Sequence, residues 1–238
     1  MRKVRNAATA LIVALSLLLA GAPAQAARDR TLDLFFTHTG EKLKITYKRN
    51  GRFIPSALTE LNRFLRDWRR NESTKVDPEL FDLLWQIQQG VGQGRTIHVV
   101  SAYRSPATNN MLRSRSRGVA KFSQHMAGKA CDFYIPGVST AEIRKAAFKL
   151  QVGGVGFYPT SRTPFVHLDT GSVRSWPRMT RSQLLAVFPD GKTVHLPDDG
   201  KPLKGYELAK AELAARDRGA RTEVASASSG GGLGSFFG

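Results

Sequence analysis

Two short segments, each pairing a histidine with an aspartate, constrain this chain more than any other feature. Residues 123–132 contain His125 and Asp132, and residues 165–169 contain His167 and Asp169. Both segments consist mainly of small or apolar residues, which is typical of a buried strand or of the loop leading into one. Two imidazoles and one carboxylate, with a fourth position open for water, are the ligands of a catalytic zinc ion. If His125, Asp132 and His167 share one metal, the chain is a hydrolase.

The residues between His125 and Asp132 favour a loop followed by a strand. On a helix, a spacing of seven would place both side chains on one face. Gly128 and the strand-like run after it argue against a continuous helix. We therefore predict a loop that carries His125, a turn at Gly128 and a strand that carries Asp132. His167 would come from a neighbouring strand.

Three further residues are candidates for substrate binding or catalysis beside the metal. Arg104 directly follows a predicted strand, where its guanidinium can bind a substrate carboxylate or carbonyl and stabilise a tetrahedral oxyanion; the alternative is a solvated loop arginine. Asp169 shares a strand face with His167 and is either the general base or a carboxylate that orients an imidazole. Ser123 either binds substrate or caps a turn.

The other histidines and the single cysteine favour structural roles. His38 falls in a predicted turn, His98 alternates within a strand, and His195 lies beside a predicted hairpin. Cys131 is the only cysteine, so the chain cannot form an internal disulfide. Because Cys131 lies in an apolar run, we expect a buried, inert thiol.

The two ends of the chain predict export. Residues 1–26 combine a basic start, a short apolar run and an Ala-x-Ala cleavage signal, which together indicate a signal peptide. The tail at residues 218–238 is rich in Ala, Ser and Gly and is predicted to be disordered. We expect a periplasmic or cell-envelope protein of bacterial type that is not inserted in the membrane after cleavage.

The charge of the chain indicates an anionic polymer as partner. The formal net charge is +17, and removal of residues 1–26, which hold three basic and no acidic residues, leaves +14. Such a charge attracts anionic polymers. Export and the lack of a recognition-helix motif argue against nucleic acid. Anionic cell-wall polymer fits the compartment better, and the alternative is a basic surface with no specific role.

The pattern of elements predicts an α+β fold with a central, mainly antiparallel sheet and helices packed on it. We expect one domain at residues 27–176 and a C-terminal extension at 177–217. The segment 101–121 is predicted to be a long loop with a helical turn near 110–113, and 187–196 to be a hairpin. The predicted strands are 31–36, 43–47, 96–100, 130–135, 152–158 and 164–169. The predicted helices follow Pro55 and Asp77 and cover 140–150 and 206–216.

Several motifs together resemble a known family. Residues 123–132 read Ser-x-His-x-x-Gly-x-Ala-x-Asp, which resembles the signature of the D-alanyl-D-alanine type zinc peptidases, a fold group shared with lysostaphin-like enzymes and the hedgehog signalling domain. The remaining pieces resemble MepK-like periplasmic murein endopeptidases. These pieces are residues 101–106, 108–121, 153–158 and 165–171, followed by Arg174 and Trp176.

This resemblance implies a fold, a metal and a reaction. It implies a hedgehog-like peptidase fold with one zinc ion held by His125, Asp132 and His167. It also implies cleavage of peptidoglycan cross-links between stem peptides that carry D-alanine and diaminopimelate. Many relatives place an acidic base three residues before the last ligand, where this chain has Pro164. Asp169 is then the candidate base by elimination.

Two alternatives to a cross-link endopeptidase stay open at the level of sequence. A D-alanyl-D-alanine carboxypeptidase would have the same fold and metal site and a shorter groove. A non-catalytic peptidoglycan-binding protein would keep the fold without the chemistry, and the absence of an acid at Pro164 keeps this alternative open. An intact set of three ligands favours catalysis, because structural zinc sites usually have four protein ligands.

Overall fold

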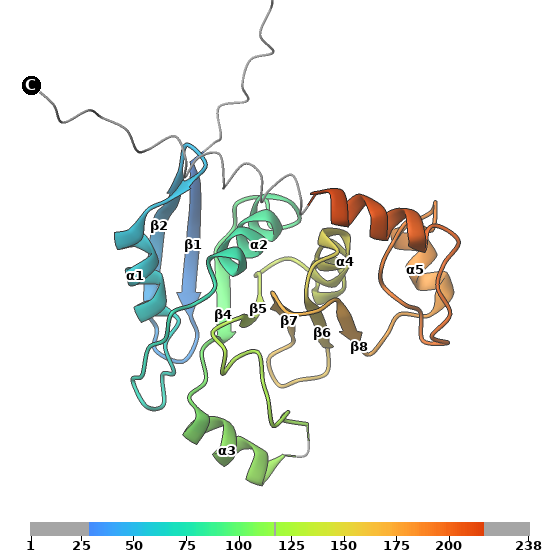
Figure 1. The fold of residues 1–238 in the computed structure, drawn as a ribbon. Helices are drawn as coiled ribbons and strands as arrows, with labels where there is room; N and C mark the ends of the chain where they lie inside the picture. Colours follow the sequence, from blue (N-terminus) through green and yellow to red (C-terminus); the bar gives the residue numbers. More distant parts are fainter. Residues whose placement is uncertain (1–28, 117, 217–238) are drawn as a thin grey trace, which may run out of the picture.

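The computed structural model describes residues 29–116 and 118–216 (Figure 1). The predicted signal peptide at 1–26 and the predicted disordered tail at 218–238 lie outside the described residues. Within them, helices and one sheet form an α+β fold, as predicted. None of the helices in this part of the chain combines the length and the apolar character needed to span a bilayer.

The described residues form one mixed sheet of eight strands in the order β3-β2-β1-β4-β5-β7-β6-β8. Among them, five neighbouring pairs are antiparallel, and two pairs, β1 with β4 and β6 with β8, are parallel. The parallel pair of β1 and β4 is possible because two helices connect these strands. The strands are β1 (Arg30–Phe36), β2 (Lys42–Arg49), β3 (Arg52–Phe53), β4 (Ile97–Ser101), β5 (Ala130–Tyr134), β6 (Gly154–Tyr158), β7 (Phe165–Asp169) and β8 (Arg174–Trp176).

Three helices cover the core: α1 (Pro55–Phe64), α2 (Pro78–Gln89) and α4 (Thr140–Leu150). Local signals explain where α2 and α4 begin. The Asp77 side chain accepts a hydrogen bond from the Glu79 amide and Pro78 occupies the first turn of α2, while Ser139 and Glu142 form a capping box at α4. Helix α1 packs on β2, α2 on β1, and α4 on β6 and β7.

The core lies on the helix-covered face of the sheet. Side chains alternate along a strand, so every second residue faces the helices. On β7, Val166 and Leu168 are buried in this core, and on β5 Cys131 and Phe133 are buried there. The residues between them, including Asp132, His167 and Asp169, therefore face the opposite side of the sheet.

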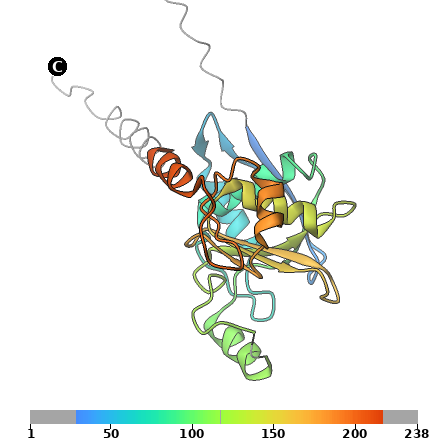
Figure 2. The same ribbon diagram turned by 90° about the vertical axis from the view of Figure 1, so that its right-hand side faces the viewer.

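The predicted loop at 101–121 contains a full helix instead of a single turn. Helix α3 (Pro106–Arg115) begins at Ser105, whose side chain accepts a hydrogen bond from the Thr108 amide at 3.3 Å. Its sequence lacks an apolar stripe, and this absence misled the prediction. Both views show α3 extending away from the body of the domain (Figures 1 and 2).

The predicted hairpin at 187–196 is wrong. Helix α5 (Arg181–Val187), which begins at a capping box of Thr180 and Gln183, covers only the first residue of this segment, and residues 188–196 form no strand. The physical reason is that this segment bonds to the end of α4 instead of pairing with itself as two strands. The Val194 amide donates to Gln151 Oε1 at 2.9 Å, and His195 Nε2 lies 3.2 Å from the carbonyl oxygen of Phe148. The predicted helix at 206–216 is present, within the limits of the described residues.

Candidate metal centre

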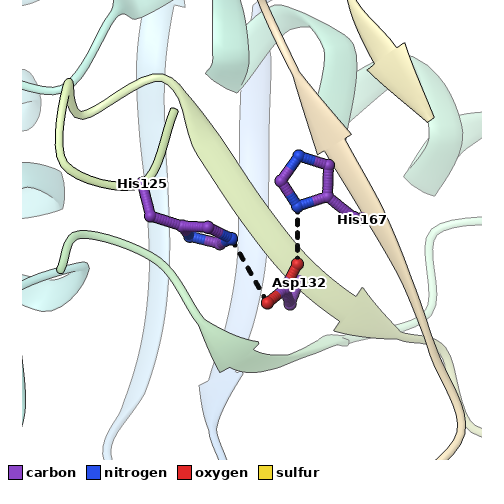
Figure 3. Close-up of side chains that lie close together, drawn as sticks. All are labelled: His125, Asp132 and His167. Carbon is purple, nitrogen blue, oxygen red and sulfur yellow. Dashed lines mark hydrogen bonds and ion pairs between the residues drawn. The ribbon is translucent and has the colours of Figure 1, made fainter. Parts of the chain in front are cut away.

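Three side chains from separate segments meet on the open face of the sheet (Figure 3). Asp132 on β5 and His167 on β7 are direct cross-strand partners, and His125 comes from the loop between α3 and β5. His167 Nδ1 lies 2.8 Å from Asp132 Oδ1, and His125 Nε2 lies 3.3 Å from Asp132 Oδ2. One ligand atom from each residue lies within 4.8 Å of the others, and all three side chains are buried.

The loop that carries His125 has the turn expected from the sequence. Gly128 adopts a positive φ of 66°, which other residues rarely adopt. A Cβ at this position would also lie 2.8 Å from the carbonyl oxygen of Lys75. The glycine therefore lets the chain reverse direction between His125 and β5.

Hydrogen bonds on the far side of each ring determine which nitrogen faces Asp132. His125 Nδ1 lies 2.7 Å from the carbonyl oxygen of Ala102, which can only accept, so Nδ1 carries a proton and a neutral ring keeps its lone pair on Nε2. His167 Nε2 lies 2.9 Å from Asp169 Oδ2, so a neutral His167 keeps its lone pair on Nδ1. Both lone pairs are thus directed toward the same point.

This donor set fits a divalent metal ion. Two ligand atoms about 2.0–2.1 Å from a tetrahedral ion lie about 3.3–3.4 Å from one another. The separation of 3.3 Å between His125 Nε2 and Asp132 Oδ2 matches that value. Two neutral imidazoles, each of which donates the N–H of its other ring nitrogen to an acceptor, together with one carboxylate, are the arrangement that such ions prefer.

Mutual interactions determine the charges of the cluster. Burial would lower the pKa of His167, but hydrogen bonds to Asp132 and Asp169 raise it to about 9. Burial would raise the pKa of Asp132, but His125 and His167 hold it well below its usual range. Without a metal, a proton on His167 therefore balances part of the negative charge of the two carboxylates.

Asp169 forms a second layer behind His167 and is completely buried. Its Oδ1 accepts from the amides of Gly154 at 2.9 Å and Gly171 at 2.8 Å and from Arg174 Nη1 at 3.1 Å. Its Oδ2 accepts from Arg174 Nη2 at 2.6 Å and from His167 Nε2. The carboxylate has no free acceptor position directed to the cleft. From the sequence, Asp169 is a candidate either for the general base or for a carboxylate that orients an imidazole. These contacts favour the second role, in which Asp169 orients His167.

A row of cross-strand partners continues from the candidate ligands Asp132 and His167 to Trp176. Gly156 on β6 pairs with His167 on one side and with Trp176 on the other. A Cβ on Gly156 would lie 2.7 Å from Cε2 of the indole, so only glycine lets the indole cover this position. The Trp176 ring then lies 5.0 Å from the His167 ring and forms one wall of the site.

The cluster lies at the base of a cleft of about 640 Å³. Arg104 lines the cleft from the loop between β4 and α3, and its amide donates to the carbonyl of His125 at 3.2 Å. Burial lowers the pKa of Arg104, while Asp132 opposes this effect. Among the described residues, its Nε is buried without a hydrogen-bond partner. Ser123 also lines the cleft, and its hydroxyl accepts from the His125 amide at 3.3 Å.

No sequence motif identifies the residue that holds the loop carrying Arg104. Asp67 is buried, and its Oδ2 accepts from the Ser105 amide at 2.9 Å and from the Ser105 hydroxyl at 2.7 Å. It also accepts from the Arg69 amide at 3.1 Å. In the sequence Asp67 is one acid within a basic segment, so only the folded structure brings it to Ser105.

The remaining histidines lie away from the cluster. His38 stacks on Trp68, His98 contacts Tyr134, and His195 packs on Phe148. Cys131 is completely buried, and burial raises the pKa of its thiol. The contacts of these residues are those of the structural roles predicted for them.

Comparison with known proteins gives one family. The family model described as "Peptidoglycan L,D-endopeptidase MepK" matches residues 24–176. The protein of that name from Escherichia coli (strain K12) is 47% identical over 149 residues, which cover 63% of this chain and 81% of the relative. The Haemophilus influenzae protein named "Probable peptidoglycan L,D-endopeptidase MepK" is 43% identical over 150 residues, 63% of this chain and 80% of the relative. No solved structure gives a significant match.

Proposed function

This chain belongs to the family of peptidoglycan L,D-endopeptidases named MepK, and we propose that it hydrolyses peptide cross-links of the bacterial cell wall with one zinc ion. The observation that carries the proposal is the convergence of His125, Asp132 and His167 at the base of a cleft. The names of the relatives support an L,D bond, such as the cross-link between two diaminopimelate residues, as the bond cleaved.

His125 Nε2, His167 Nδ1 and the Asp132 carboxylate would hold the ion, and ligand type favours zinc. When bound, zinc supplies a Lewis acid for the scissile carbonyl and lowers the pKa of water. Asp169 accepts the Nε2 proton of His167 and keeps this ring in the tautomer that presents Nδ1. The carbonyl oxygen of Ala102 accepts the Nδ1 proton of His125 and keeps that ring in the tautomer that presents Nε2.

Arg104 binds the substrate on the cleft side of the ligands. A guanidinium in a partly buried site binds a carbonyl or carboxylate oxygen more strongly than one in water. Arg104 lines the cleft beside the three candidate ligands, and its Nη1 donates to Asn109 Oδ1 at 3.4 Å, which supports a guanidinium held in place to bind substrate. Ser123 also lines the cleft and either contacts the substrate there or caps the turn that carries His125.

The organisation of the whole chain is part of the proposal. Residues 1–26 are a signal peptide that directs the protein to the periplasm, 27–176 are the peptidase domain with the hedgehog-like peptidase fold, 177–217 are a C-terminal extension and 218–238 are the C-terminal tail. The net charge of the full chain is +17, and the +14 that is left after removal of residues 1–26 supports attraction to anionic wall polymer rather than to nucleic acid in this compartment.

Digestion of purified muropeptides tests the proposal. The protein without residues 1–26 is incubated with dimers joined by a diaminopimelate-to-diaminopimelate bond and with dimers joined by a D-alanine-to-diaminopimelate bond. We expect cleavage of the first dimers, loss of cleavage with a chelator and recovery on addition of zinc. Dimers that stay intact in a zinc-replete reaction would contradict the proposal.

Two other outcomes of the same experiment would identify the alternatives. Release of D-alanine from monomeric pentapeptides, with all dimers intact, would identify a carboxypeptidase. Binding to wall sacculi without release of any fragment would identify a non-catalytic binding protein. His167→Ala is the matched variant, since it removes a ligand of the metal and leaves Arg104 in place.

A further inference from the structure

The hydroxyl of Tyr158 is held in the cleft in a defined orientation. Tyr158 is the last residue of β6 and lies on the same face of this strand as Gly156, which pairs with His167. Its ring stacks on that of its cross-strand partner Phe165, with centroids 4.6 Å apart and planes inclined by 21°. Trp176 Nε1 lies 2.7 Å from the Tyr158 hydroxyl oxygen. Two neighbours therefore fix both the ring and its polar end.

The contact with Trp176 determines the role of the hydroxyl. An indole N–H can only donate, so the Tyr158 oxygen must accept this hydrogen bond. The phenol keeps its own proton as a donor. Within residues 29–116 and 118–216, this proton has no acceptor. The protein thus holds a hydrogen-bond donor ready for a group that enters the cleft.

The surroundings of the hydroxyl indicate a negatively charged oxygen as that group. Tyr158 lines the same cleft as His125, Asp132, His167 and Arg104, and it lies close enough to Arg104 to interact with its charge. Asp132 is the only carboxylate among the described residues that line the cleft. A second acidic side chain that would compete for the Tyr158 proton is therefore missing from this lining.

We propose that Tyr158 donates a hydrogen bond to the oxyanion that forms on the scissile carbonyl oxygen during hydrolysis. This inference rests on the proposed peptidase function. In the reaction, water forms a bond to the carbonyl carbon, the peptide C–N bond breaks, and a proton from the water passes to the leaving amine nitrogen, while Tyr158 keeps its own proton throughout. Trp176 acts as a positioning residue, because its N–H determines where the phenol proton points.

Steady-state kinetics of the zinc-loaded enzyme without residues 1–26 test the proposal. Tyr158→Phe retains the ring that stacks on Phe165 and removes only the hydroxyl. Loss of one donor to an oxyanion lowers kcat about 10²-fold, with KM changed by less than about 2-fold. Tyr134→Phe is the matched control, because it also removes a hydroxyl from a strand of this sheet, and Tyr134 does not line the cleft. We expect wild-type kinetics for this control.

Binding of a phosphinate analogue gives a second readout that does not depend on turnover. The tetrahedral phosphinate oxygen mimics the oxyanion, whereas a product peptide does not. By calorimetry, Tyr158→Phe should weaken the phosphinate at least about 10-fold and leave the product peptide within about 2-fold. Zinc content and thermal unfolding should match the wild type.

Three results would overturn the proposal: unchanged kcat in Tyr158→Phe, equal weakening of phosphinate and product peptide, or loss of zinc from the variant. Trp176→Phe leaves the phenol in place without its donor and should weaken the phosphinate by a smaller factor. If Tyr158→Phe does not fold, wild-type affinity in Trp176→Phe is the contradicting result. A wild-type enzyme that cleaves no dimer contradicts the proposed function itself, and this outcome is distinct from a defect confined to Tyr158→Phe.

Discussion

Replacement of Asp169 by asparagine separates the two roles considered for this residue. In the wild type, one oxygen accepts from the amides of Gly154 and Gly171, and the other accepts from His167 and Arg174. An asparagine has only one acceptor oxygen, so its NH₂ group must face one of these pairs of donors. In either orientation, buried donors lose their acceptor.

The size of the effect follows from these contacts. A buried donor without an acceptor costs about 1–3 kcal/mol. Since two donors are affected and such costs are not additive, we expect Asp169→Asn to lower the free energy of unfolding by about 2–4 kcal/mol. For a domain of this size, that corresponds to a fall in Tm of about 5–15 °C. Loss of a carboxylate behind a histidine ligand also weakens metal binding about 10- to 100-fold.

The assay is a competition for zinc against a chromophoric chelator, together with thermal unfolding. Asp199→Asn is the control, because it changes an exposed carboxylate that is paired with Arg181. If Asp169 orients His167, zinc affinity falls in Asp169→Asn and stays unchanged in the control. Wild-type zinc affinity combined with a collapse of kcat would refute this reasoning and identify Asp169 as the general base.

Three other predictions follow from the same contacts. Gly156→Ala places a methyl group against the Trp176 indole, and we expect at least a 10-fold loss of kcat/KM in the muropeptide assay with zinc content retained. Asp67→Ala leaves the buried donors of Ser105 without an acceptor, and we expect a loss of about 2–4 kcal/mol in urea unfolding. The pKa of His167 is raised from 6.5 to about 9, so its contribution to stability is complete below pH 6.5 and is lost as the pH rises to about 9. In the presence of a chelator, Tm should therefore fall between these pH values, and a Tm that rises there would contradict this assignment.

The parts of the fold that the sequence predicted correctly are those with strong local signals. The apolar strands at β5 and β7 and the capped helices α2 and α4 lie where their residues indicated. The start of α3 has the same type of signal, Ser105 followed by a proline, but the polar sequence after it predicts a loop. The parallel pairing of β6 with β8 has no local signal, because it depends on chain segments meeting in the folded sheet.

The residues of the candidate site also divide into those that could be predicted from the sequence and those that could not. Residue type and spacing, together with the family resemblance, select His125, Asp132 and His167, which the structure brings together. The hydrogen-bond partners of Asp169 and of Tyr158 were not predictable from spacing. In both cases the partner is a side chain of β8 that packs over a glycine of β6. Arg174 reaches Asp169 in this way, and Trp176 reaches Tyr158. Such contacts are determined by sheet register and not by a local pattern.

Anomalous diffraction at the zinc edge, from crystals of the zinc-loaded protein, tests the central claim most directly. We predict one peak about 2.0–2.1 Å from His125 Nε2, from His167 Nδ1 and from a carboxylate oxygen of Asp132. His167 Nε2 should remain hydrogen-bonded to Asp169. A peak elsewhere in the domain, or one bonded to His167 Nε2, would contradict the assignment of these three residues as the metal site.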